Sequence, residues 1–157
     1  MPYGTLRHDS RNPFQWAAVA GLYLFSLVQL ATGSFPGQIE ENADLAYKYI
    51  WGIMLNLGAT FALVGMLVSV WLGWRKESNK NAKGLGLEAF GLYVFGLSVL
   101  VYSATLFGLM EKSALLAAVC FFSLGVAGLW RGWGIHKGLR RIAKGQDPRT
   151  GKARMGK

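Results

Sequence analysis

The side chains with the greatest capacity for chemistry in this sequence are polar groups inside long apolar stretches. Glu88 and Arg131 are the charged residues within those stretches, and each lies a few residues from the end of its stretch. Gln29 and Asn56 add uncharged amides. A charged group inside a membrane is costly, and it commonly marks an ion pathway or a proton relay. Glu88, Asn56 and Gln29 are therefore candidate intramembrane polar residues.

Each candidate also has a structural interpretation, which we favour at this stage. Asn56 and Gln29 are expected to hydrogen-bond between helices rather than to line a polar path. Glu88 is expected in the first turn of its helix, where the helix dipole favours a carboxylate. Lys83 or Arg75 would then neutralise it.

Motifs for catalysis are missing from the sequence. It contains no Gly-x-Ser-x-Gly, no His-Glu-x-x-His, no phosphate-binding glycine loop and only one cysteine, Cys120. His136 lies among Arg and Lys residues, which suits a headgroup contact better than a metal or haem ligand. We expect no enzymatic activity, no cofactor and no metal site.

Four apolar stretches must position the polar candidates, and they define the expected fold class. They cover 14–33, 49–74, 87–110 and 114–133, and each reaches the roughly 20 residues of a bilayer-spanning helix. The chain is 52% hydrophobic and only 16% charged, which is too few polar residues for a soluble surface. The first stretch is too long for the apolar region of a signal peptide, so we expect it to be retained. The sequence predicts an all-α, integral membrane four-helix bundle.

The distribution of basic residues predicts the orientation of this bundle. The tails 1–13 and 134–157 and the connection 75–86 carry most of the Lys and Arg, whereas the first connection is acidic. Lys and Arg concentrate in cytoplasmic loops, so both termini are expected on the cytoplasmic side of the inner membrane. Because the net charge of +9 follows this topology, no nucleic-acid partner is expected. The aromatic residues expected to anchor the inner interface are Trp71, Trp74, Trp130 and Trp133.

The basic tail 134–157 has a predicted role at the membrane surface. Gly134 and Gly138 weaken any helix there. The cations expected to bind anionic lipid headgroups, at about 1 kcal/mol each, are Lys137, Arg140, Arg141 and Lys144. Docking of an acidic partner or of nucleic acid is the alternative.

Two parts of the sequence are similar to each other. Residues 21–30 read GLYLFSLVQL and residues 91–100 read GLYVFGLSVL, and Trp-x-Gly-Trp occurs at both 71–74 and 130–133. We interpret this as a tandem duplication of a two-helix hairpin. Chance recurrence of common membrane residues is the alternative.

Small residues recur at helical spacing in the second and fourth stretches. Helices in lipid associate where small side chains let their backbones approach closely. We expect these positions to pack within one bundle, and contact with a second copy is the alternative. They are Gly58, Ala62, Gly65, Ser69, Gly73, Gly125, Gly128 and Gly132.

Three segments carry a resemblance to a known group of proteins. They are the Arg7–Trp16 segment RHDSRNPFQW, the glycine-rich second stretch, and Leu87–Leu92 (LEAFGL) with Tyr102 following it. With these segments the chain resembles small four-pass membrane proteins encoded by phages of actinobacteria. The resemblance covers most of the chain, and it implies a holin-like, lysis-accessory or exclusion protein that oligomerises in the host cytoplasmic membrane. It implies no site residues.

Two other functions remain open from the sequence. One is an accessory or structural subunit of a larger membrane complex. The other is a small-solute transporter, in which neutralising Glu88 would abolish uptake. None of the four stretches has a polar face along its whole length, so a pore would need a large oligomer.

Overall fold

Within the residues that the structure describes, the protein is all-α and has four helices, each long and apolar enough to cross a membrane. The computed structural model describes residues 13–35, 44–74, 78–108 and 115–144, without the side chains of 71–81. The predicted fold class of a helical, multi-pass membrane protein is confirmed at this level. The helices are α2 (Pro13–Thr32), α4 (Leu45–Trp74), α5 (Ser78–Gly108) and α6 (Leu115–Ala143).

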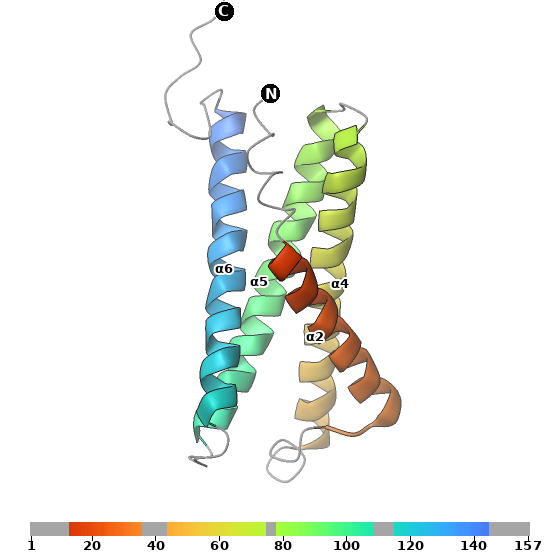
Figure 1. Ribbon diagram of the computed structural model, residues 1–157, viewed down its shortest axis with the longest axis vertical. Helices are drawn as coiled ribbons and strands as arrows, with labels where there is room; N and C mark the ends of the chain where they lie inside the picture. The colour runs from red at the N-terminus through yellow and green to blue at the C-terminus, as the bar shows by residue number, and fades with distance from the viewer. Residues whose placement is uncertain (1–12, 36–43, 75–77, 109–114, 145–157) are drawn as a thin grey trace, which may run out of the picture.

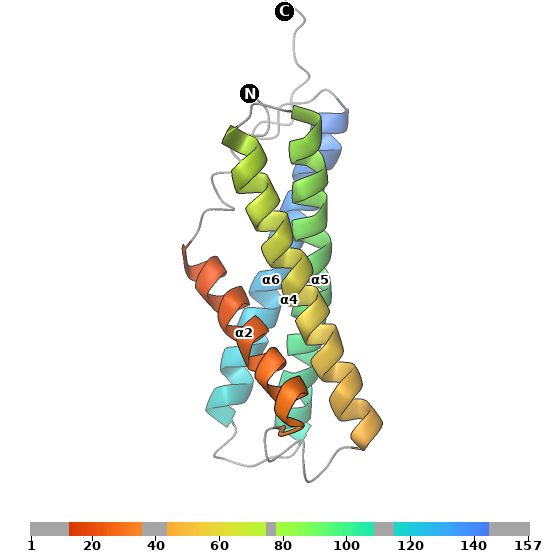
Figure 2. The ribbon, with the colours of Figure 1, turned by 90° about the vertical axis from the view of Figure 1, so that its right-hand side faces the viewer.

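The helices pack in the order α2, α4, α5, α6. Helices α4 and α5 form the central antiparallel pair, α6 packs along α5, and α2 packs obliquely on α4 (Figures 1 and 2). Helix α6 ends at one end of the bundle, where α4 also ends and α5 begins. We call this the basic end, because the last turn of α6 carries Arg140 and Arg141. The outer helices α2 and α6 each have one main neighbour.

Two helices extend further at the basic end than their apolar stretches predict. Helix α5 begins at Ser78 rather than at residue 87, and α6 continues to Ala143 rather than ending at residue 133. Gly134 and Gly138 therefore do not end the helix. Ile135 is 0% exposed, so burial of this part of the helix in the bundle offsets the low helix propensity of the two glycines.

Helix lengths relate the bundle to a bilayer. Helix α2 has 20 residues, which gives a length of about 30 Å, the thickness of a typical hydrocarbon core. Helices α4, α5 and α6 have 30, 31 and 29 residues, and they reach beyond the start of α2 at the basic end (Figure 1). Because α2 lies obliquely to the other helices, it covers less than its own length along the bundle axis.

Glycines allow the backbones of α4 and α5 to touch. A Cβ added at Gly58, Gly65 or Gly91 would lie under 3.0 Å from backbone atoms of the facing helix. Gly65 lies directly against the backbone of Glu88, so this packing also fixes the position of the buried acid. Of the other small residues singled out in α4, Ala62 is 0% and Ser69 is 2% exposed.

The glycines of α6 face the other side of α5. Gly125 lies against Gly96 and Leu100, and Gly132 lies against Ala89 and Tyr93. Gly128 is also buried and makes looser contacts with α5. These small residues have contacts within the chain, and the surroundings of Gly73 lie outside the described residues.

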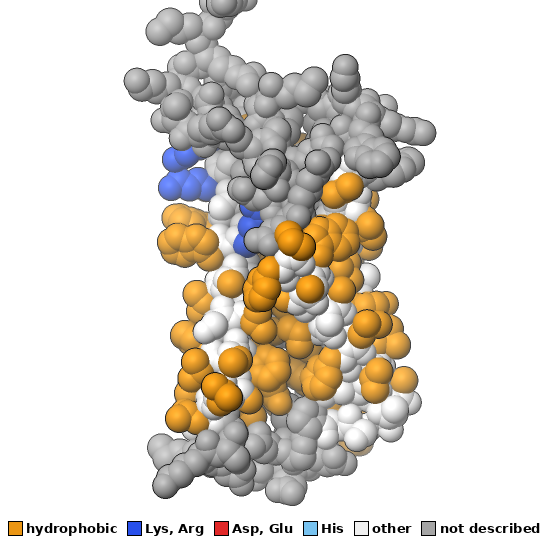
Figure 3. Space-filling view, in the orientation of Figure 1, with side chains coloured by type: hydrophobic (Ala, Val, Ile, Leu, Met, Phe, Trp, Pro, Cys, Tyr) orange, Lys and Arg blue, Asp and Glu red, His pale blue; other side chains and the backbone are white. Residues whose placement is uncertain are grey.

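The outer surface of the bundle is apolar along most of its length. Figure 3 shows hydrophobic side chains covering the face with α2 and α6, while the Lys and Arg side chains gather toward the basic end. Only 17% of the membrane-length window is buried in α2 and in α6, against 39% in α4 and 50% in α5. Such a surface is suited to lipid or to another membrane protein.

The two hairpins of the predicted duplication pack differently. Gly21 and Gly91 are equivalent in the repeat, yet Gly21 has nothing within 4 Å of an added Cβ whereas Gly91 meets Ala62. In the α5–α6 pair Gly125 lies against Gly96, whereas in the α2–α4 pair Gly52 meets the side chain of Leu30 and Asn56 bonds Ser26. The duplication therefore stays a prediction from the sequence.

Candidate functional site

Glu88 is fully buried in the third turn of α5, with 0% of its surface exposed. Ten residues separate it from Ser78 at the start of the helix, which is about 15 Å along the axis. The expectation that Glu88 occupies the first turn was wrong, because α5 begins earlier than the apolar stretch. The free N–H groups of the helix terminus are therefore too distant to stabilise its carboxylate.

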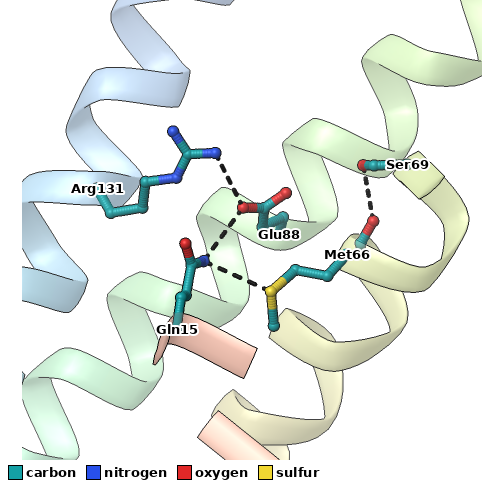
Figure 4. A network of polar contacts seen from close by, with 6 residues as sticks. Gln15, Met66, Ser69, Glu88 and Arg131 are labelled. Atoms are coloured by element: carbon teal, nitrogen blue, oxygen red, sulfur yellow. Dashed lines mark hydrogen bonds and ion pairs between the residues drawn. The ribbon is translucent and has the colours of Figure 1, made fainter. Parts of the chain in front are cut away.

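Two side chains from other helices reach the same carboxylate oxygen. Arg131 of α6 places Nη2 3.4 Å from Oε1 of Glu88 and forms an ion pair with it. Gln15 of α2 donates from Nε2 to the same Oε1 at 3.3 Å (Figure 4). Arg131 therefore neutralises Glu88, whereas Lys83 is exposed and Arg75 lies outside the described residues.

Gln15 connects α2 to both central helices. Its Nε2 also lies 3.5 Å from the sulfur of Met66 in α4 (Figure 4). An amide nitrogen carries two hydrogens, so it can serve both acceptors. The cluster consists of Gln15, Met66, Glu88 and Arg131, which come from four different helices. It joins these helices to one another near the start of α2.

Polar groups lie toward both ends of the inward face of α2, with Val19 and Leu22 between them. Gln15, Ser26 and Gln29 lie at the heptad-like spacing of one helix face, and Ser26 and Gln29 are 0% and 4% exposed. The opposite face is apolar, with Leu24 and Val28 exposed. We call Gln15, Ser26 and Gln29, together with Asn56 of α4, the polar seam.

Only part of the polar seam is satisfied by hydrogen bonds. Asn56 donates from Nδ2 to Oγ of Ser26 at 3.1 Å, and Ser26 donates to the carbonyl of Tyr23 at 2.8 Å. This is the interhelical bond expected for Asn56. Oε1 of Gln29 is buried and has no hydrogen-bond partner within the part of the chain that the structure describes. Such an atom costs free energy unless a partner or water reaches it.

At the other end of the bundle, polar groups serve packing. The indole Nε1 of Trp51 donates to the carbonyl of Ser98 at 2.9 Å, and Ser103 donates to the carbonyl of Ala118 at 2.8 Å. Tyr102 stacks near Trp51 with ring centroids 4.9 Å apart. These contacts join α4, α5 and α6 at their far ends and leave no obvious reactive group.

The predicted anchors of α6 lie on its outer surface. Trp130 and Trp133 are 71% and 50% exposed, and Lys137 lies 4.9 Å from the ring centre of Trp133. Arg140 and Lys144 are exposed, and Arg141 is half-buried. The side chains of Trp71 and Trp74 lie outside the described residues.

Neither the comparison with known proteins nor a search for metal ligands assigns a role to this site. Comparison of the chain with protein families, curated proteins and solved structures finds no match. No group of three His, Cys, Asp or Glu side chains gathers within the described ranges. The site is therefore defined by its geometry, as an ion pair with a polar seam.

Arg131 and Gln15 belong to the site but were not among the candidates chosen from the sequence. The sequence contained a signal for each of them. Glu88 and Arg131 have opposite signs, and alternating helix directions place both at the same end of the bundle. Gln15 lies on the same helical face as Ser26 and Gln29. Pairing the opposite charges, and reading that face as inward, would have found both.

The hydrogen bond between Asn56 and Ser26 is expected to contribute little to stability. A double-mutant cycle with Asn56→Ala and Ser26→Ala should give a coupling of about 0.6 kcal/mol, the average for interhelical hydrogen bonds in membranes. Unfolding by sodium dodecyl sulfate in mixed micelles measures it. Pairing Asn56→Ala with Ser123→Ala on α6 serves as the control and should be additive, because Ser123 bonds only its own helix. A coupling near zero in the first cycle would contradict the assigned bond.

Proposed function

We propose that the protein is a holin-like membrane protein, of the phage lysis, lysis-accessory or exclusion type. It acts by associating with further copies of itself in the host cytoplasmic membrane, with both termini in the cytoplasm and without catalytic chemistry. Its halves derive from one duplicated hairpin. The observation that carries the proposal is the polar seam on the inward face of α2.

A water-filled passage through a bilayer needs helices with one polar and one apolar face. Helix α2 has such faces in its C-terminal half, where Ser26 and Gln29 lie inward and Leu24 and Val28 lie outward. Toward Gln15 the inward face carries Val19 and Leu22, so the polar face does not run along the whole helix. In a single copy the polar face lies against α4. When copies associate and the α2–α4 contact opens, the same face turns toward water, and Oε1 of Gln29 gains hydrogen bonds that it lacks in the closed bundle.

Helix α2 is also attached weakly enough for such an opening. It packs against one main neighbour, only 17% of its membrane-length window is buried, and no glycine contact of the α4–α5 kind holds it. Its polar links to the other helices include the Gln15 contacts and the bond between Ser26 and Asn56.

The outer face of α6 supplies a surface for lateral association. Leu116, Phe122 and Trp130 are 77%, 50% and 71% exposed, and packing of such faces drives helix association in lipid. The basic end of α6, with Lys137 and Arg140, suits anionic headgroups of the cytoplasmic leaflet. An accessory subunit of a larger complex would use the same surface, so the two functions must be separated by experiment.

Controlled expression of the full chain in a bacterial host tests the proposal. We expect abrupt loss of membrane potential, read with a potential-sensitive dye, and lysis once an endolysin is supplied. The double variant Ser26→Leu/Gln29→Leu should insert normally and leave the potential intact, because it removes the polar face of α2. The control Leu24→Val/Val28→Leu changes the apolar face alone and should behave like the original chain.

Undisturbed potential despite good membrane insertion would contradict the holin-like function. It would leave the accessory subunit as the explanation for the exposed apolar faces. Equal depolarisation by the seam variant and its control would show that α2 does not line the passage.

A further inference from the structure

We propose that α2 turns about a hinge at Gly33 when the contacts of Gln15 with Glu88 and Met66 are broken. We call these contacts the latch. When the latch opens, the N-terminal half of α2 moves away from α4 and α5, while its C-terminal end stays attached to α4. The motion itself does not depend on a holin-like function, whereas its effect on the timing of membrane depolarisation rests on the proposed function.

The C-terminal end of α2 is anchored by packing on α4. Phe35 lies just beyond the helix and is 5% exposed, and its ring meets that of Tyr49 edge to face at 5.5 Å. Gly52 of α4 makes room for Leu30 and Phe35, since an added Cβ would lie 3.1 Å from the first side chain and 3.5 Å from the second. Side chains on both sides of the helix end therefore hold this end against α4.

Gly33 lies between these two anchoring side chains and provides the hinge. Its φ of 65° lies in the left-handed region, which glycine adopts without strain, and its N–H donates to the carbonyl of Gln29 at 2.9 Å. Hinges absorb large changes of φ and ψ at a few residues next to the end of an element. A rotation of α2 can therefore be taken up at Gly33 while Phe35 stays in place.

The N-terminal end of α2 is held by the latch. Nε2 of Gln15 donates to Oε1 of Glu88 at 3.3 Å and lies 3.5 Å from the sulfur of Met66, and both partners are 0% exposed (Figure 4). A cavity of about 200 Å³ separates this half of α2 from α6. Its lining from the two outer helices includes Phe14, Ala18, Val19, Leu124, Ala127 and Gly128. On that side the N-terminal half can move without displacing another helix.

The length of α2 converts opening of the latch into opening of the polar seam. Gln15 and Ser26 precede Gly33 by 18 and seven residues, which is about 27 and 10 Å along the helix axis. A rotation of about 10° at the hinge moves Gln15 by roughly 5 Å and Ser26 by roughly 2 Å. The latch therefore breaks first, and a larger rotation also separates Ser26 from Asn56, whose hydrogen bond is 3.1 Å long.

Distances between pairs of spin labels in the purified full chain measure this motion. Both pairs are introduced together with Cys120→Ser, which removes the exposed native cysteine. The latch pair, Ala17→Cys/Val64→Cys, and the hinge pair, Thr32→Cys/Ile53→Cys, each join α2 to α4 at exposed positions. Pulsed electron paramagnetic resonance in lipid nanodiscs gives the fraction of molecules with a long distance at each pair.

Breaking the latch should change one pair and not the other. Gln15→Leu should raise the long-distance fraction of the latch pair about tenfold, or about 1.4 kcal/mol, which is near the lower end for a hydrogen bond to a charged group. The hinge pair should keep its distance. Gln15→Met also removes the donor and serves if Gln15→Leu does not fold, as judged by gel filtration. The control Phe25→Leu changes an exposed apolar side chain of the same helix and should leave both pairs unchanged.

Unchanged distances at the latch pair in both Gln15 variants would overturn the proposal. So would equal lengthening of both pairs, which would mean that α2 leaves α4 as a whole instead of turning at Gly33. In cells, loss of membrane potential should begin earlier with Gln15→Leu than with Phe25→Leu. If the labels respond to Gln15→Leu but neither variant depolarises the membrane, the latch stands and the holin-like function fails.

Discussion

Replacing Arg131 with glutamine is expected to lower the free energy of unfolding by about 3 kcal/mol, the lower end of the range for breaking a buried ion pair. The acid partner Glu88 is 0% exposed, so the variant keeps a carboxylate inside the protein without this guanidinium. We take the lower end because the arginine side chain is 18% exposed and its distance to the carboxylate is 3.4 Å. Unfolding of the purified chain by sodium dodecyl sulfate in mixed micelles, followed by helical circular dichroism, provides the measurement.

A compensating variant and a surface control separate the ion pair from a general effect of the substitution. The double variant Glu88→Gln/Arg131→Gln should recover most of the lost stability, because two neutral amides avoid the buried charge and can still hydrogen-bond Gln15. Arg140→Gln on the same helix is exposed and should change stability by less than about 0.5 kcal/mol. If Arg131→Gln is as stable as Arg140→Gln, the ion pair does not hold the bundle together.

The existence of the four helices was predictable because the bilayer imposes a minimum apolar length. All four predicted stretches contain a membrane-length helix. The helix ends at the basic end were not predictable from hydropathy, because residues beyond the hydrocarbon core need not be apolar. There α5 and α6 continue as a packed pair, and buried Ile135 outweighs the low helix propensity of Gly134 and Gly138.

The sequence predicted some of the residues of the candidate site, but it did not predict which of them contact one another. Glu88 and Asn56 were identified as polar groups in apolar surroundings, and both lie in interhelical contacts. The partner of Glu88 was predicted to be Lys83 or Arg75, which are near it in the sequence. In the structure the relative rotation and depth of α5 and α6 select Arg131. Those two quantities are set by where the small residues allow close approach, so they follow from tertiary packing.

The close approach of α4 and α5 gives the second large expected effect. An alanine Cβ at Gly91 would lie under 3.0 Å from backbone atoms of Phe61 and Ala62, which cannot move away as a flexible side chain can. Gly91→Ala should therefore force the two helices apart and lower the free energy of unfolding by about 1–3 kcal/mol. Because Gly65 holds the backbone of Glu88 in the same interface, separation of the helices should also disturb the ion pair with Arg131.

The same helix offers a matched control at Gly86, where an added Cβ meets nothing within 4 Å. Gly86→Ala should raise stability by about 0.5–1 kcal/mol, since alanine restricts the unfolded chain and favours a helix. Both variants make the same chemical change in α5, so opposite signs in the same unfolding assay isolate the effect of helix contact. A stabilising effect of Gly91→Ala would mean that the backbones of α4 and α5 do not touch there. The position of Glu88 would then need a different explanation, because this contact is what places it within reach of Arg131.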